Sequence, residues 1–157
     1  MKLTLIFTGK TRPGYLKEGI DIYTKRLGHY APVKIKTIEE QGGKSGSSRA
    51  KTKFAKSEKI ISGIDNNSYV VLLDEKGETF SSHEFARFVE KTMTHGYKEF
   101  VFISGGAYGF PDYLYNKANK VISLSQMTFS HQMVRLILAE QLYRAMTIIR
   151  GESYHHE

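Results

Sequence analysis

A glycine-rich segment, "SGGAYGF" at residues 104–110, directly follows the apolar run "EFVFI". Glycines at the end of a buried strand allow the backbone to approach a ligand or another segment closely. The pattern Gly105-Gly106-x-x-Gly109 differs from the GxGxxG of dinucleotide-binding sites, and it follows a late strand instead of the first one. A P-loop fits no better, because "GKS" at 43–45 lacks the first glycine of that motif. The spacing therefore argues against a phosphate-binding loop.

Two further segments come after apolar runs in the same way, "LLDEKGE" at 72–78 and "SLSQMTFSHQ" at 123–132. Loops at the carboxyl ends of parallel strands meet at one edge of a sheet, where α/β proteins bind their ligands. The second segment combines hydroxyl groups with apolar side chains: Ser123, Ser125, Thr128 and Ser130, with Met127 and Phe129 between them. Such a mixture suits an uncharged aromatic ring, for example an adenine, better than a phosphate.

The elements that would position these loops alternate between strand and helix patterns. Continuous apolar runs at 69–74 and 99–104 are typical of strands buried on both faces, and 120–125 is a weaker third. Between the first two, Ser81 and Glu84 form the capping-box pattern of a helix start. The N-terminal part adds, in order, a strand at 2–8, a helix at 14–30, a strand at 33–40 and a basic helix at about 49–62. The alternation predicts an α/β fold with a mostly parallel sheet flanked by helices, in one domain that spans the whole chain.

The last long element is a helix from about His131 to Ile149. Of the 17 residues from Met133 to Ile149, 12 are apolar, and they lie nearly all round the helix. Because a chain of this length has a limited interior, we expect part of that surface to contact a second subunit. The alternative is a fully central helix in a monomer. Glu140 and Arg144 stand four residues apart, in the order that favours an intrahelical ion pair.

The net charge of +7 lies entirely in the N-terminal part of the chain. Residues 1–60 hold 14 Lys and Arg against 5 Asp and Glu, whereas residues 61–157 hold 9 against 11. This excess fits either a solvated face or the electrostatic footprint of an RNA-binding surface. The absence of cysteine excludes disulfides and cysteine-based zinc sites. The N-terminal apolar run is too short for a signal peptide and no stretch could span a membrane, so we expect a soluble, cytoplasmic protein without a metal.

The whole chain resembles a known family of enzymes, most specifically from residue 99 onward. The segments "LSQMTFSHQMVRLILAEQLYRAMTIIRGESYHHE" and "FISGGAYG", with the start "KLTLIFTGK", are similar to the small SPOUT-class methyltransferases of the ribosomal large subunit methyltransferase H family. The resemblance spans residues 1–157 and is weakest at 41–60, for which nothing is carried over. It implies a SPOUT (α/β-knot) fold with a C-terminal trefoil knot, a knotted cofactor-binding part at roughly 69–157, and a homodimer.

The resemblance also implies an activity: S-adenosylmethionine-dependent methylation of N3 of a pseudouridine in a stem-loop of 23S rRNA, with the assembled ribosome as the expected substrate. The implied cofactor contacts are Leu73, Gly105, Leu124, Ser125, Gln126, Met127, Thr128 and Phe129. They fall on the three loops that the strand pattern selects independently. Ala107 and Tyr108 add bulk to the glycine loop, and the orientation of Tyr108 is left open.

Methyl transfer to a weakly acidic imide nitrogen requires alignment of the nitrogen with the methyl group and stabilisation of the imide anion by donors and cations. The candidate catalytic residues are His155, Tyr154, Arg135 and His131, and the candidate RNA-binding residues are Arg144 and Arg150. In the family the C-terminal tail completes the active site, so we expect "RGESYHHE" to be functional and not a frayed terminus. His155 is the first candidate for the general base and His131 the second, while water or no dedicated base is the remaining option.

Each candidate also has a structural interpretation. His131 could be a capping or core histidine, and Arg144 could pair only with Glu140. Two other functions remain open. A non-catalytic RNA- or ribosome-binding module would bind RNA with steep salt dependence and transfer no methyl group. An α/β enzyme for a small acidic metabolite would act without RNA.

Overall fold

The computed structural model describes residues 1–38, 63–105, 110 and 112–155. The predicted basic helix at 49–62 and the pair Ala107-Tyr108 lie outside the described residues. The elements are β1 (Lys2–Thr8), α1 (Tyr15–Leu27), β2 (Val33–Ile38), β3 (Ser68–Thr79), α3 (Ser82–Thr94), β4 (Glu99–Ser104), α4 (Asp112–Lys117), β5 (Lys120–Ser123) and α5 (His131–Arg150). Within the described parts of the chain, no helix is both long and apolar enough to cross a membrane.

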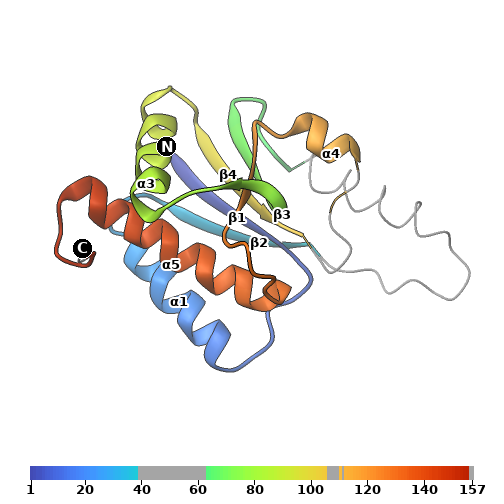
Figure 1. Cartoon of the computed structure of the whole chain (residues 1–157), viewed down its shortest axis with the longest axis horizontal. Coiled ribbons are helices and arrows are strands. Elements are labelled where there is room, and N and C mark those ends of the chain that lie inside the picture. Colours follow the sequence, from blue (N-terminus) through green and yellow to red (C-terminus); the bar gives the residue numbers. More distant parts are fainter. Residues whose placement is uncertain (39–62, 106–109, 111, 156–157) are drawn as a thin grey trace, which may run out of the picture.

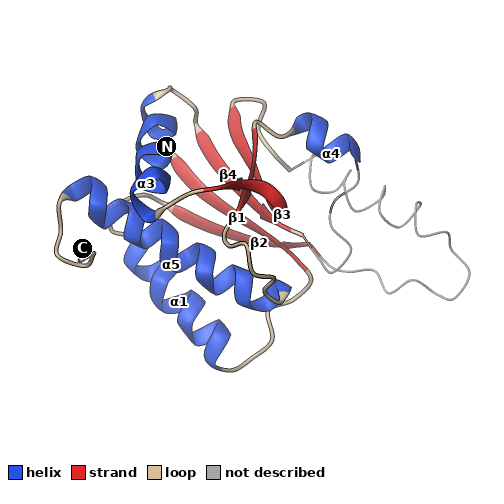
Figure 2. Cartoon of the chain, in the orientation of Figure 1, coloured by secondary structure: helices blue, strands red, loops and turns tan. Residues whose placement is uncertain are grey.

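The five strands form one sheet in the order β2-β1-β4-β3-β5, and each neighbouring pair is parallel (Figure 2). The predicted α/β fold with a parallel sheet flanked by helices is confirmed. The central strand β4 is buried along its whole length, as its continuous apolar sequence predicts. The capping box at Ser81 and Glu84 is present and opens α3 one residue later.

Helices α1, α3 and α5 cover one face of the sheet, and α4 lies on the other (Figure 1). The larger core lies on the three-helix face and includes Phe85 of α3, Phe102 of β4 and Leu142 of α5. The smaller core packs Leu114 of α4 against Val101 and neighbouring strand residues. Helix α5 packs against both α1 and α3. Its start and its end lie on opposite sides of the molecule (Figure 1).

Strand β3 is longer than the predicted 69–74 because it continues beyond an irregular stretch. Leu73 and Glu78 both pair with Ile122 of β5, and the residues between them bulge away from the ladder. Gly77 lies within this stretch, and a Cβ atom there would come within 2.5 Å of the Ile122 backbone. Only a residue without a side chain fits this approach, so the glycine permits the bulge. The bulge carries Asp74 and Glu75 to the carboxyl edge of the sheet.

A buried carboxylate joins the amino ends of three strands. Glu99 of β4 accepts hydrogen bonds from Thr4 Oγ1 (2.5 Å) and Ser68 Oγ (3.1 Å) and pairs with Lys2 Nζ (3.0 Å). Burial alone would raise the pKa of Glu99, but the bonds from Thr4, Lys2 and Ser68 outweigh it and hold the pKa below its usual value.

We expect Glu99→Gln to flatten the acid dependence of stability. Because the Glu99 pKa is depressed in the folded chain, its ionised form stabilises the fold above the unfolded pKa of about 4.3, and this stabilisation is lost as the pH falls through the folded pKa. The wild-type Tm should therefore fall more between pH 7 and pH 3 than that of Glu99→Gln, which should already be lower at pH 7. Glu90→Gln, on the exposed face of α3, is the control and should follow the wild type. Parallel losses in wild type and Glu99→Gln would contradict the prediction.

Candidate functional site

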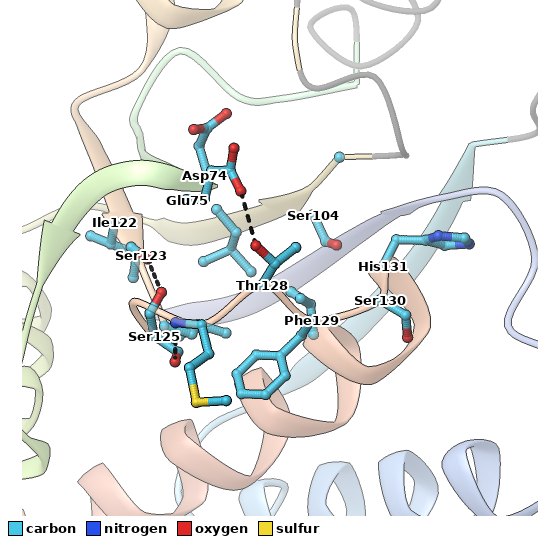
Figure 3. A pocket seen from close by; sticks show the side chains of 15 residues that line it. Asp74, Glu75, Ser104, Ile122, Ser123, Ser125, Thr128, Phe129, Ser130 and His131 are labelled. Atoms are coloured by element: carbon cyan, nitrogen blue, oxygen red, sulfur yellow. Dashed lines mark hydrogen bonds between the residues drawn. The ribbon is translucent and has the colours of Figure 1, made fainter.

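A cavity of about 420 Å³ lies at the carboxyl edge of the sheet, where the three predicted loops meet (Figure 3). Leu73 and Asp74 reach it from β3, Ser104 and Gly105 from the end of β4, and residues 122–125 and 127–130 from β5 onward. Its remaining wall is the start of α5, including His131 and Val134. The volume lies within the range of small-molecule sites.

The cavity combines apolar walls with two carboxylates. Leu73, Met127 and Phe129 supply apolar surface, and Asp74 and Glu75 line the same cavity. Figure 3 shows the two carboxylates and Phe129. Met127 is 74% exposed and Phe129 37%, so both lie at the mouth of the cavity and leave apolar surface uncovered. A ligand with an aromatic ring and a positive charge would match these walls.

The two carboxylates have different partners. Asp74 accepts hydrogen bonds from Tyr115 Oη (2.5 Å) and from the backbone N–H of Lys76 (2.9 Å), which fix its orientation. Burial and this bond to Asp74 raise the pKa of Tyr115 to about 12, so the phenol remains a donor. Glu75 faces Thr128, whose hydroxyl lies 3.4 Å from its Oε2 (Figure 3).

The loop after β5 is shaped by its own hydroxyl groups. Ser123 Oγ donates to the carbonyl of Ser125 (2.7 Å), and Ser125 Oγ accepts from the N–H of Met127 (2.9 Å). Ser130 then caps α5 by accepting from the N–H of Met133 (3.2 Å). These local bonds satisfy polar groups of the loop without a strand partner.

Gly105 is close to a side chain as well as to the cavity. A Cβ atom at Gly105 would lie 3.1 Å from the ring of Phe110, which packs in the smaller core. The glycine therefore lets the strand end pass over Phe110 while it lines the cavity on its other side.

Most of the residues named as cofactor contacts line this one cavity: Leu73, Gly105, Leu124, Ser125, Met127, Thr128 and Phe129. Gln126 does not line it and is exposed. The sequence argument did not single out Asp74, Glu75 or Ser104 individually. The signal was available, since Asp74 and Glu75 lie in the selected segment 72–78 and Ser104 lies next to Gly105.

Arg135 does not line the cavity. Its side chain is fully buried, donates to the Thr8 carbonyl (2.7 Å) and to Thr11 Oγ1 (2.9 Å), and lies over the ring of Phe7. Gln132 holds the same loop by donating to the Lys10 carbonyl (3.0 Å). In this structure Arg135 therefore ties the loop between β1 and α1 to the start of α5.

The tail candidates gather around Glu140 and Arg144 of α5. Glu140 Oε1 accepts from Arg144 Nε (3.0 Å) and from Tyr154 Oη (3.1 Å). The Arg144 guanidinium lies 4.8 Å from the centre of the Tyr154 ring, and its Nη1 lies 3.1 Å from His155 Nδ1. Tyr23 of α1 contacts Tyr154 Oη at 3.2 Å. Arg144 thus pairs with Glu140, as the spacing predicts, and contacts the tail as well.

These two groups of residues are far apart within one chain. At 1.5 Å per residue, Arg144, which contacts the tail, lies about 20 Å along α5 from His131, and Arg150, at the end of the helix, lies about 28 Å from it. His131 lies at the cavity end, while Arg150 is exposed at the other end, beside the C-terminus (Figure 1). The structure therefore brings the cofactor candidates together with His131, but not with Tyr154, His155, Arg144 or Arg150.

Comparisons with known proteins assign the chain to a family. The model of the family described as predicted SPOUT methyltransferase matches residues 1–155. Proteins named ribosomal RNA large subunit methyltransferase H are 47% identical in Parabacteroides distasonis, over all of both chains, and 49% identical in Cytophaga hutchinsonii, over 99% of this chain and all of the other. A solved structure of a probable methylase family protein from Haemophilus influenzae has a similar fold, with a TM-score of 0.52 and 14% identity over 96% of this chain and 66% of the other. The chain therefore belongs to the SPOUT methyltransferases, within the ribosomal RNA large subunit methyltransferase H family.

Proposed function

We propose that the chain is an S-adenosylmethionine-dependent methyltransferase that methylates N3 of a pseudouridine in a stem-loop of 23S rRNA, on the assembled ribosome in the cytoplasm. The observation that carries the proposal is the cavity at the carboxyl ends of β3, β4 and β5, with apolar walls and two carboxylates. The relatives of the chain carry the name of an rRNA large subunit methyltransferase.

The residues of the cavity fit this cofactor. Leu73, Leu124 and Met127 offer apolar surface for an adenine ring, and the backbone around Ser125 offers polar groups for its edge. Asp74 and Glu75 complement the positive charges of the amino group and the sulfonium centre. When bound, S-adenosylmethionine supplies an electrophilic methyl group. The protein must then hold the acceptor nitrogen in line with it and stabilise the imide anion.

A complete site requires a second copy of the chain. Tyr154, Arg144 and His155 are suited to bind a uracil-like ring and its charge, but they do not line the cavity of their own chain. The tail packs on Arg144, which follows His131 by 13 residues, or about 20 Å along α5. On α1, Tyr15 and Ile22 stand seven residues apart and are 72% and 51% exposed, which leaves apolar surface uncovered. We therefore propose a homodimer of single-domain chains in which the tail of one chain completes the cavity of the other.

The function is tested by transfer of labelled methyl groups to assembled ribosomes, free large subunits and protein-free rRNA, compared side by side. We expect incorporation at one pseudouridine of 23S rRNA, greatest with assembled ribosomes. Calorimetry with S-adenosylmethionine should show one binding site per chain. Salt-dependent RNA binding without methyl incorporation would instead favour a binding module, and turnover of a small metabolite alone would favour the third alternative.

Gly77→Ala is expected to weaken cofactor binding. The new methyl group would lie 2.5 Å from the Ile122 backbone, which cannot move aside as a side chain could. Overpacking of this kind costs about 1–3 kcal/mol, and relief requires β5 or the Asp74–Glu75 bulge to shift. The Kd for S-adenosylmethionine, measured by calorimetry, should rise about tenfold.

Gly96→Ala is the control for that variant. Gly96 has a φ of 81° and open space around its Cβ position, so alanine costs about 1 kcal/mol of stability through backbone strain. Because Gly96 lies in the turn between α3 and β4, away from the cavity, the Kd of Gly96→Ala for S-adenosylmethionine should equal that of the wild type. Equal Kd values for both variants would contradict the role of the bulge.

A further inference from the structure

The hydrogen bonding of His155 limits what its ring can do. Arg144 Nη1 lies 3.1 Å from His155 Nδ1. A guanidinium group has only N–H donors and stays charged in proteins, so it cannot accept a hydrogen bond. In this contact Nδ1 is therefore the acceptor, and the single proton of the neutral imidazole resides on Nε2.

Arg144 is itself held in place for this contact. Its Nε and Nη2 both donate to Glu140 Oε1, at 3.0 and 2.5 Å, and the side chains of Arg144 and Glu140 are only 24% and 17% exposed. The hydrogen bond to Glu140 raises the pKa of Arg144 further. The ring of His83 on α3 packs edge-to-face against His155, with centroids 4.9 Å apart, and supports its orientation.

Tyr154 is not the general base that would remove the N3 proton. Its hydroxyl donates to Glu140, which as a carboxylate only accepts, so Tyr23 must be the donor in the Tyr23–Tyr154 contact. Burial, followed by the contacts with Tyr23 and Glu140, raises the pKa of Tyr154 above its ordinary value. Tyr154 therefore remains a neutral phenol near neutral pH.

We propose that Arg144, positioned by Glu140, holds His155 as the Nε2–H tautomer, so that His155 donates a hydrogen bond to the substrate ring and does not act as a base. This rests on the proposed function and deepens it. The acceptor is a carbonyl oxygen beside N3, where the negative charge of the imide anion gathers. The N3 proton passes to water, the N3–C bond then forms as the methyl C–S bond breaks, and His155 keeps its Nε2 proton throughout.

The tautomer is measured directly by long-range ¹H–¹⁵N correlation on the full-length, ¹⁵N-labelled protein at pH 8, where histidines of ordinary pKa are neutral. His95 is an internal reference of the opposite kind, because its Nδ1 lies 2.5 Å from the Lys91 carbonyl and must carry the proton. We expect the Nε2–H pattern for His155 and the Nδ1–H pattern for His95. An Nδ1–H pattern for His155 would overturn the proposal, and this readout needs no variant.

Arg144→Met should remove the preference of His155 for the Nε2–H tautomer. We expect the Nδ1–H form of His155 to appear in this variant, while Arg87→Gln, on the exposed surface of α3, leaves the spectrum of His155 unchanged. An unchanged His155 spectrum in folded Arg144→Met would show that Arg144 does not fix the tautomer.

Two substitutions of His155 then separate donor from base. Glutamine places an N–H near the position of Nε2 but has no basic nitrogen, whereas alanine provides neither. A donor role predicts methyl transfer by His155→Gln within about fivefold of wild type and a loss of about 10- to 100-fold in His155→Ala, the worth of one hydrogen bond to a charged group. A general-base role predicts that both variants lose methyl transfer equally, by about 10²- to 10⁴-fold. If the wild type binds no S-adenosylmethionine, the proposed function fails, while the tautomer measurement stands or falls by itself.

Discussion

Deletion of residues 150–157 is expected to abolish methyl transfer and leave the affinity for S-adenosylmethionine within about twofold of wild type. The deletion removes Tyr154 and His155, which provide aromatic surface and a donor for the acceptor ring, but no residue that lines the cavity. Loss of residues that act as a unit on the transition state lowers the rate by about 10³-fold or more. Labelled methyl transfer measures the rate, and calorimetry measures the affinity.

Deletion of 150–157 also removes the last residue of α5, so a second, shorter deletion serves as its control. Gly151 and Glu152 donate backbone hydrogen bonds to the carbonyls of Ile148 and Thr147, and Glu152 accepts from Tyr30 Oη at 2.5 Å. Deletion of 153–157 keeps these contacts and should preserve the Tm more closely than deletion of 150–157. Because it still removes Tyr154 and His155, its activity should be equally low. Substantial activity in either protein would show that the tail is dispensable.

Much of the fold could be predicted from local sequence. The continuous apolar run at 99–104 became β4 with the expected bounds, since a strand covered on both faces has no polar side to interrupt its pattern. The capping box at Ser81 could also be predicted from local sequence, because both of its hydrogen bonds lie within four residues. The bulge in β3 depends on the close approach of Ile122 to Gly77, a contact between distant segments that no local pattern encodes.

The cavity was more predictable than the roles of the charged residues. Three strand ends select its lining, because parallel strands bring their carboxyl ends to one edge. Arg135 could not be assigned in this way. The sequence makes it a candidate catalytic residue, but its partners are the Thr8 carbonyl and Thr11, which only the packing of α5 against the β1–α1 loop reveals. The tautomer of His155 likewise follows from one distance to Arg144 and from no sequence pattern.

Mixing two inactive proteins is expected to restore methyl transfer. One chain lacks residues 150–157. The other carries Thr128→Trp, which places an indole at the exposed mouth of the cavity beside Glu75 and blocks the cofactor. If the tail of one chain completes the cavity of its partner, each mixed dimer has one intact site, so random exchange should restore about one quarter of the wild-type rate.

The outcome follows from the length of α5. A tail that served its own cavity would have to leave Arg144 and move back along α5 by about 20 Å, and no mixed dimer could then contain a chain with both parts intact. The control mixture pairs the tail-deleted chain with a chain that carries both changes. It forms the same dimers but contains no intact tail, so it should stay inactive. Equal inactivity of both mixtures, with mixed dimers demonstrated by mass spectrometry, would rule out a site shared between two chains.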